Sequence, residues 1–271
     1  MNDPPNPAAG STTVRSNLPP ALWRRLLAEF VGTALLLTAV VGSGIMAQRL
    51  SPDDVGLQLL ETAIATATAL VAIILALGPV SGAHLNPVVT LAERLLGTLS
   101  SGQAAAYIAA QLLGAAAGCI LANLMFSLPA VELSTTARST PGRWLGEVVA
   151  TFGLLLVIAG LVRSRRTSAV PYAVGAYIGA AYWFTSSTGF ANPAATLART
   201  LTDTFAGIAP GSAPAFVAAE LTGAALAVIT IAALYPRIRR TAAEVVPPPG
   251  PTATGTHPTG LAQAVSSPSS E

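Results

Sequence analysis

The stretch NPAATLAR at residues 192–199 closely repeats the stretch NPVVTLAE at residues 86–93. Both copies predict the start of a helix, because Asn is a preferred N-cap residue and Pro is favoured at the first helical position. Each predicted helix is too short, at roughly 10 residues, to cross a bilayer, which needs about 20 residues. The sequence therefore predicts two half-helices, and each of them begins at an Asn.

The composition is typical of a polytopic membrane protein. Of the 271 residues, 52% are hydrophobic and 10% are charged, whereas about 25% of the residues in soluble domains are charged. Six apolar runs are predicted as transmembrane helices at a window of about 19 residues. They cover residues 26–47, 57–77, 103–126, 145–162, 169–184 and 214–235. The half-helices fall between the second and third runs and between the fifth and sixth.

The sequence carries no pattern typical of an enzyme or of a nucleic-acid-binding protein. It has no nucleophile–base pair, metal-ligand cluster or phosphate-binding loop. Its arginines lie at the ends of apolar runs and are not interleaved with aromatic residues, as they are in many nucleic-acid surfaces. The single cysteine, Cys119, excludes an internal disulfide. We therefore expect no catalysis, no cofactor, no metal and no nucleic-acid partner.

The two halves of the chain resemble each other beyond the two half-helices. LAEFVGT at residues 27–33 is echoed by LGEVVAT at 145–151, and YIAAQLLG at 107–114 by FVAAELTG at 216–223. Each half holds three spans and one half-helix, so the halves insert with opposite topology. Inverted repeats with broken helices are typical of transport folds, whose solute site lies where the broken helices meet. Three glycines in these spans suit close helix crossings, namely Gly114, Gly118 and Gly223.

These patterns divide the chain into a membrane domain and two tails. The membrane domain is predicted at residues 21–240, with its repeats at about 21–128 and 140–240. Residues 1–20 and 241–271 are rich in Pro, Ser and Thr, so we expect them to be disordered.

The arginines predict the orientation of the membrane domain. They concentrate before the first span, between the fourth and fifth spans, and after the sixth, at Arg24 and Arg25, at Arg163, Arg165 and Arg166, and at Arg237, Arg239 and Arg240. These three places share one side of a six-span protein, and the positive-inside rule makes that side cytoplasmic. Both termini are therefore expected in the cytoplasm, with the half-helix at Asn86 entering from inside and the one at Asn192 from outside.

Two half-helices that enter from opposite faces can meet N-terminus to N-terminus around a water-filled path. Asn86 and Asn192 would cap their helices through the side-chain carbonyl and turn their amide donors to the lumen. The helix dipoles add about half a positive charge at each N-terminus, which repels cations. The sequence predicts a passive pore for small uncharged polar solutes that excludes ions and protons. The alternative is a coupled secondary transporter, which would need an ionisable group at the centre.

At this point the chain resembles the aquaporin or major intrinsic protein family, over about residues 23–240. The resemblance rests on SGAHLNPV at 81–88, on NPA at 192–194 and on the paired glutamates Glu29 and Glu147. It implies an all-α right-handed bundle of six transmembrane helices and two re-entrant half-helices in inverted repeats. It also implies a homotetramer with one pore per subunit in the lipid bilayer.

The resemblance assigns expected roles to individual residues. The pore motifs are Asn86, Pro87, Val88, Asn192, Pro193 and Ala194. Glu29 and Glu147 are expected to hold the re-entrant loops by hydrogen bonds, with proton coupling as the alternative role. His84 is expected in the loop or vestibule beside the first motif.

The chain departs from the family at the outer constriction. Water- and glycerol-conducting members usually carry an Arg where this chain has Ala195. By alignment the other constriction positions are Thr66, Gly189 and Tyr182. Thr66, Gly189 and Ala195 predict a wide, weakly polar ring, which Tyr182 can narrow. The Asp that glycerol facilitators carry soon after the second motif is missing here, since the nearest is Asp203.

Two further stretches, YWFTSSTGFAN at 182–192 and TDTFAGIAP at 202–210, resemble a bacterial branch of the family that lacks the filter Arg. Some members of that branch are associated with arsenic detoxification. The resemblance implies a bacterial plasma-membrane channel for neutral metalloid acids such as arsenite, for methylated arsenicals and for polyols. The alternative substrate class is that of a general glycerol, water or urea facilitator.

Arg199 is the cation nearest to the altered constriction position. It lies four residues beyond Ala195, one helical turn further along the same predicted face. Two roles remain open for it. Arg199 either replaces the missing filter cation in part, or anchors the outer loop through an ion pair with Asp203.

Overall fold

The computed structural model describes residues 20–235 of the chain, so most of both predicted tails lies outside the described residues. The described part contains helices, turns and loops, and no strand. In chain order its elements are α1 (Leu22–Leu50), α2 (Val55–Ser81), α3 (Pro87–Leu96), α4 (Ser101–Met125), α5 (Pro141–Arg163), η1 (Thr167–Ala169), α6 (Val170–Phe184), α7 (Pro193–Ala198), η2 (Arg199–Leu201) and α8 (Ala213–Leu234).

Each of the six predicted spans corresponds to one helix in the described part. Five of them, α1, α2, α4, α5 and α8, are long and apolar enough to cross a membrane. The sixth, α6, has 15 residues and follows the short 3-10 helix η1. At 1.5 Å per residue α6 covers about 22 Å, less than the full apolar thickness of about 30 Å. It nevertheless lies in the bundle, where it packs against α2 and α5.

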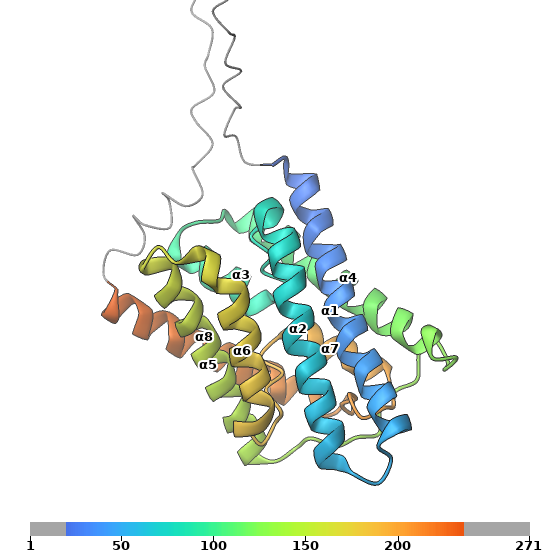
Figure 1. Ribbon diagram of the computed structural model, residues 1–271. Coiled ribbons are helices and arrows are strands. Elements are labelled where there is room, and N and C mark those ends of the chain that lie inside the picture. The colour runs from blue at the N-terminus through green and yellow to red at the C-terminus, as the bar shows by residue number, and fades with distance from the viewer. Residues whose placement is uncertain (1–19, 236–271) are drawn as a thin grey trace, which may run out of the picture.

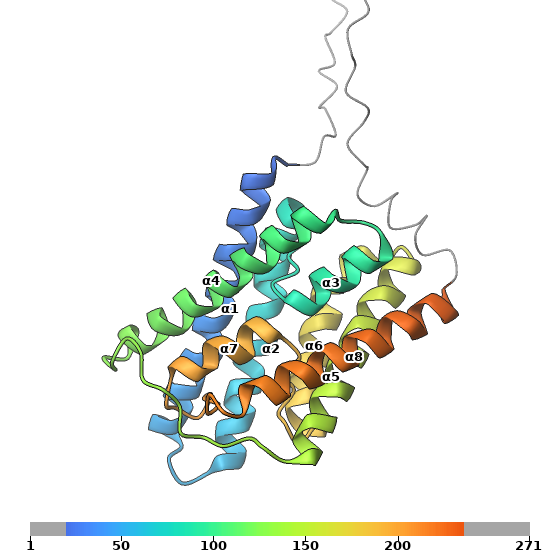
Figure 2. The ribbon, with the colours of Figure 1, turned by 180° about the vertical axis from the view of Figure 1, so that it is seen from behind.

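The helices are arranged as two inverted halves. Figure 1 shows α1, α2, α6 and α5 side by side, and Figure 2, the view from behind, shows α4 and α8 in front of them with α3 and α7 in between. The contacts repeat from one half to the other. α1 packs against α2 and α4, as α5 packs against α6 and α8. Each of the half-helices α3 and α7 contacts both α4 and α8. The inverted-repeat bundle predicted from the sequence is therefore confirmed.

Glycines allow the closest helix crossings, as predicted. A Cβ added at Gly114 or Gly118 of α4 would overlap the backbone carbonyls of Phe30 and Ala34 in α1. In the second half, a Cβ at Gly223 of α8 would overlap the backbone of α5. Both halves thus place glycine at the equivalent helix crossing, where the backbones of the two helices are in contact.

The two half-helices differ in length. The first, α3, has 10 residues and ends at Gly97, which adopts the left-handed conformation that favours glycine. The second, α7, has only 6 residues and continues as the 3-10 turn η2. The prediction of roughly 10 α-helical residues is wrong for this copy. The chain leaves the helix because the carbonyl of Arg199 accepts its hydrogen bond from the N–H of Ile208 in the following loop.

Candidate functional site

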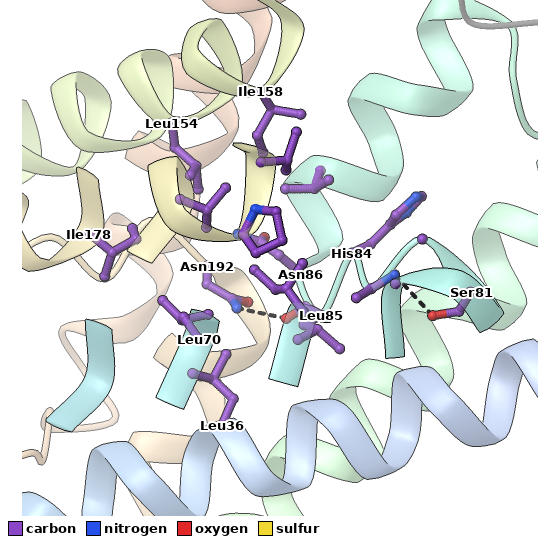
Figure 3. Close-up of a pocket in the computed structure, with 18 of the residues that line it drawn as sticks. Leu36, Leu70, Ser81, His84, Leu85, Asn86, Leu154, Ile158, Ile178 and Asn192 are labelled. Carbon is purple, nitrogen blue, oxygen red and sulfur yellow. Dashed lines mark hydrogen bonds between the residues drawn. The ribbon is translucent and has the colours of Figure 1, made fainter. Parts of the chain in front are cut away.

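A cavity of about 970 Å³ lies between the two halves of the bundle. At one end it is lined by Arg25, near the start of α1, and by Thr167 after α5. Arg199 lines the other end, where the neighbouring Phe205 N–H donates to Gln48 near the end of α1. Between these ends the wall is largely apolar, as Figure 3 shows for Leu36, Leu70, Leu154, Ile158 and Ile178.

Asn86 and Asn192 lie together in the middle of this cavity (Figure 3). Each caps its own half-helix through the side-chain carbonyl. Asn86 Oδ1 accepts from Val88 N at 3.0 Å, and Asn192 Oδ1 accepts from Ala194 N at 3.0 Å. Both helices carry Pro at the first position, Pro87 and Pro193. The N-termini of α3 and α7, with the positive ends of their dipoles, therefore meet at one point.

The amide groups of the two asparagines tie the halves to each other. Asn86 Nδ2 donates to the carbonyl of Ala191 at 2.7 Å, and Asn192 Nδ2 donates to the carbonyl of Leu85 at 2.9 Å. The prediction that the amide donors face the lumen is therefore wrong for one N–H of each asparagine, because that N–H bonds the opposite loop. No second acceptor among the described residues contacts either nitrogen, so each amide keeps one N–H for a solute.

The residue before each asparagine has a left-handed backbone, with φ of 52° at Leu85 and 47° at Ala191. Such a conformation costs a non-glycine residue about 1–3 kcal/mol and persists only where its surroundings fix it. A buried glutamate does so in each half. The N–H of Leu85 donates to Glu29 Oε2 at 2.7 Å, and the N–H of Ala191 donates to Glu147 Oε2 at 2.7 Å.

Glu29 of α1 collects four donors and is completely buried. Besides Leu85 N, it accepts from the hydroxyl of Ser81 at 2.6 Å, from His84 N at 3.0 Å and from Gln111 Nε2 at 2.8 Å. Because all four partners are donors, the carboxyl group of Glu29 is the common acceptor for the loop that leads into α3 and for Gln111.

Glu147 of α5 occupies the equivalent place in the second half and is also completely buried. It accepts from Phe190 N at 2.9 Å in addition to Ala191 N. Neither glutamate lines the cavity.

His84 lines the cavity on the Arg25 side of the asparagines. Its Nδ1 lies 3.1 Å from the hydroxyl of Thr90, and its ring packs against Tyr107 with 5.3 Å between centroids. Tyr107 is itself held by Arg25, whose Nε donates to the phenol oxygen at 2.6 Å. The imidazole therefore lies in the vestibule wall, fixed on two sides.

The four predicted constriction residues, Thr66, Tyr182, Gly189 and Ala195, all line the cavity near Arg199. The hydroxyl groups of Thr66 and Tyr182 hydrogen bond to each other at 3.0 Å, so one O–H of the pair is used and the other remains a donor. Gly189 has φ of 58°, and a Cβ there would lie 2.7 Å from the Cβ of Ala181. The small side chain of Ala195 leaves its part of the wall without a polar group.

Arg199 supplies the charge at this end of the cavity. It is 5% exposed, its Nε donates to the carbonyl of Ala206, and its guanidinium lies over the ring of Phe190 at 3.4 Å from the centroid. Arg199 thus anchors the outer loop through Ala206, but the suggested ion pair with Asp203 is wrong, because Asp203 Oδ1 accepts from the N–H of Thr135 at 2.8 Å instead. No acceptor among the described residues contacts Nη1 or Nη2 of Arg199.

Two residues of the site were missed by sequence reasoning. Glu220 of α8 is completely buried and accepts from the N–H of Asn192 at 3.1 Å. Its signal was present, because Glu220 takes the place of Gln111 in the repeat. Arg138 donates through Nε to the carbonyl of Gly207 at 2.9 Å, and its guanidinium also lies over Phe190, at 5.2 Å. Nothing in the sequence marked Arg138, since its partners are backbone groups of a distant loop.

Comparisons with known proteins agree with this geometry. The family model for Major intrinsic protein matches residues 17–191. The Aquaglyceroporin AqpS of Rhizobium meliloti (strain 1021) is 51% identical over 230 residues, which are 83% of this chain and 98% of the relative. Aquaporin-5 of Rattus norvegicus is 36% identical over 155 residues, 55% of this chain and 57% of the relative.

Among solved structures, the aquaglyceroporin from Plasmodium falciparum matches with a TM-score of 0.62 and 24% identity. The match covers 80% of this chain and 99% of that one, and it supports the fold. The resemblance predicted from the two Asn-Pro motifs is thus confirmed. The chain belongs to the major intrinsic protein family and is an integral membrane channel for small solutes, not an enzyme.

Proposed function

We propose that the channel conducts small uncharged polar solutes passively and excludes ions and protons where Asn86 and Asn192 meet. The observation that carries the proposal is the pair of capped half-helices that meet end to end inside one cavity. A cation there meets two positive helix ends, whereas a hydroxyl oxygen finds one free N–H on each amide.

A passive channel also fits the position of the buried carboxyl groups. A coupled transporter needs an ionisable group in the solute path. Glu29, Glu147 and Glu220 line no part of the cavity, and the first two are occupied as acceptors for the re-entrant loops. Glu93 does line it, but toward the C-terminal end of α3, where it accepts from the hydroxyl of Thr98, and not where the asparagines meet. We therefore assign Glu29 and Glu147 to loop support, not to proton coupling.

The constriction favours neutral polyhydroxy solutes over a narrow water file. Ala195 leaves space, the hydrogen bond between Thr66 and Tyr182 uses one of their two O–H groups, and the terminal nitrogens of Arg199 remain as donors. Neutral arsenous acid, methylated arsenicals and glycerol all offer hydroxyl oxygens to such a donor. Arg199 would thus replace, from one turn further along, the cation that Ala195 lacks. A general glycerol, water or urea facilitator is the second candidate, favoured by the relative named an aquaglyceroporin.

The chain is proposed to lie in the bacterial plasma membrane with both termini in the cytoplasm, as a homotetramer. Arg25 and Thr167, which follows Arg163, Arg165 and Arg166, line the same end of the cavity, as the positive-inside rule requires for the cytoplasmic side. The membrane domain is proposed to extend over residues 21–240, flanked by tails at 1–20 and 241–271.

Stopped-flow measurements on proteoliposomes test this proposal. Swelling rates are compared for water, glycerol, urea and arsenous acid, with potassium and proton flux followed in the same vesicles. We expect glycerol and arsenous acid to pass without saturation and without an ion gradient. Flux that saturates at low solute concentration, or that stops when an ion gradient is removed, would assign the protein to coupled transport.

A further inference from the structure

The side chain that supports each loop glutamate differs between the two halves. In the first half it is Gln111 of α4, whose Nε2 donates to Glu29 at 2.8 Å and to the hydroxyl of Thr90 at 2.9 Å. Gln111 therefore acts here as a donor, and Glu29 can remain an ionised acceptor. The bond links α4 to α1 behind the first half-helix.

In the second half the same place is held by Glu220 of α8. Its Oε1 accepts from the hydroxyl of Thr196 at 2.6 Å and from Asn192 N at 3.1 Å, and Thr196 is the repeat equivalent of Thr90. The other oxygen, Oε2, is buried and has no hydrogen-bond partner among the described residues. Glu220 Oε1 and Glu147 Oε2 accept from the adjacent N–H groups of Asn192 and Ala191, so the two carboxyl groups lie side by side and interact. Gln111 likewise leaves its Oε1 buried and without a partner, so the halves differ in the atom turned to the loop glutamate. That atom is an amide N–H donor in the first half and a carboxyl oxygen in the second.

Charges around the pair cannot stabilise two anions. Glu147 and Glu220 are both completely buried, and two like charges in contact there do not both ionise. Arg199 of η2 acts on both carboxyl groups, and Arg138 acts on Glu147. The half-helix α3 also packs against α8, but its own charged residues, Glu93 and Arg94, lie toward its C-terminal end, away from the centre. Neither guanidinium donates a hydrogen bond to either carboxyl group, because Arg138 bonds the carbonyls of Gly207 and Phe205 and Arg199 bonds that of Ala206. Two carboxylates side by side would therefore have no donor between them.

We propose that Glu220 is a positioning residue that carries a proton and donates to Glu147 the hydrogen bond that Gln111 donates to Glu29. Oε1 continues to accept from the N–H of Asn192. Glu147 stays ionised and holds the loop before α7. The second half-helix is thereby held through a proton that can be lost, whereas the first is held through an amide that cannot.

This difference makes the permeability depend on pH, and that consequence rests on the proposed place of Asn192 in the pore. When the pair loses its proton at alkaline pH, two carboxylates repel each other directly behind Asn192. The loop before α7 then loses its support, and permeability falls. The first half has no equivalent loss of a proton, because Gln111 is an amide.

Three variants in proteoliposomes test the proposal by glycerol flux across a pH series. In Glu220→Gln the amide supplies the missing donor permanently, so the alkaline loss of flux seen in the parent protein should disappear. Gln111→Glu places a second acid in the first half and should add an alkaline loss. Glu132→Gln changes an exposed carboxyl group in an outer connection and serves as the matched control, with an unchanged profile.

Infrared spectroscopy measures the proton independently of flux. The parent protein at neutral pH should show a carboxylic-acid C=O band that shifts in heavy water, disappears at alkaline pH and is absent in Glu220→Gln. Absence of that band in the parent protein would overturn the proposal even if the channel conducts. The same holds for a Glu220→Gln protein that folds normally and keeps the parent pH profile. A channel that conducts no neutral solute while the band is present would contradict the proposed function alone.

Discussion

The two halves of this channel build the same half-helix support from different side chains. In the first, Glu29 accepts four hydrogen bonds, and its neighbour Gln111 is a donor. In the second, Glu147 holds the equivalent loop beside the acid Glu220. The ends of the two motifs differ as well, since Glu93 and Arg199 occupy equivalent positions and both line the cavity. The comparison shows that a repeat can keep its geometry while its charges change.

The largest expected effect is the loss of stability when a loop-supporting glutamate is removed, and it should differ between the two halves. Glu29→Ala leaves several buried donors without an acceptor, including Ser81 and Gln111, and each costs about 1–3 kcal/mol. Glu147→Ala orphans fewer donors and also removes the neighbour that Glu220 faces. We expect the free energy of unfolding to fall in both variants, by more in Glu29→Ala. Thermal unfolding in detergent measures this, and an equal or larger loss in Glu147→Ala would contradict the comparison.

A glycine-to-alanine substitution at the equivalent helix crossing should lower stability by a similar amount in the two halves. Gly114→Ala and Gly223→Ala each place a methyl group against a helix backbone, so both should lower stability by about 1–3 kcal/mol. Gly102→Ala is the control, because a Cβ at that position meets open space. Unfolding midpoints of the three variants test the symmetry. A large loss in only one of the two crossings would show that the halves pack differently.

Arg199 should affect conduction more than stability. Arg199→Ala removes the free donors at the constriction, so we expect a several-fold lower glycerol permeability with potassium still excluded by the asparagines. Arg143→Ala serves as the control, because Arg143 does not line the cavity and bonds a loop carbonyl. Stopped-flow swelling measures both. Unchanged water and glycerol permeability in Arg199→Ala would remove this residue from the filter.

The smallest expected effect on stability concerns the hydrogen bond between Thr66 and Tyr182 at the constriction. Tyr182→Phe and Thr66→Val each break one neutral hydrogen bond, worth about 0.5–1.5 kcal/mol. Because the two hydroxyls hydrogen bond to each other, the double variant should lose less stability than the sum of the single variants. A double-mutant cycle on unfolding free energies gives this coupling. Strict additivity would show that the two hydroxyls act separately.

Much of the fold was predictable because its signals are local. The Asn-Pro starts of α3 and α7, the six apolar runs and the small residues at the crossings can all be read directly from the chain. The shorter α7 was not predictable, since the end of the helix depends on a bond from Ile208 to the carbonyl of Arg199.

The partners of charged groups were the least predictable part of the site. Asp203 is close to Arg199 in sequence, yet Thr135 takes its carboxylate. Arg138 and Glu220 also act through contacts with distant segments. These contacts depend on which loops fold over the Arg199 end of the cavity, and local sequence patterns do not encode that folding.

The central claim, that neutral solutes pass the facing asparagines and ions do not, is tested by one paired measurement. Purified protein in liposomes is assayed for glycerol flux and, in the same preparation, for potassium and proton current under an applied potential. The account predicts rapid, non-saturating glycerol flux with no current above that of empty liposomes. An ohmic cation current through the subunit's own pore, appearing together with the glycerol flux, would contradict it.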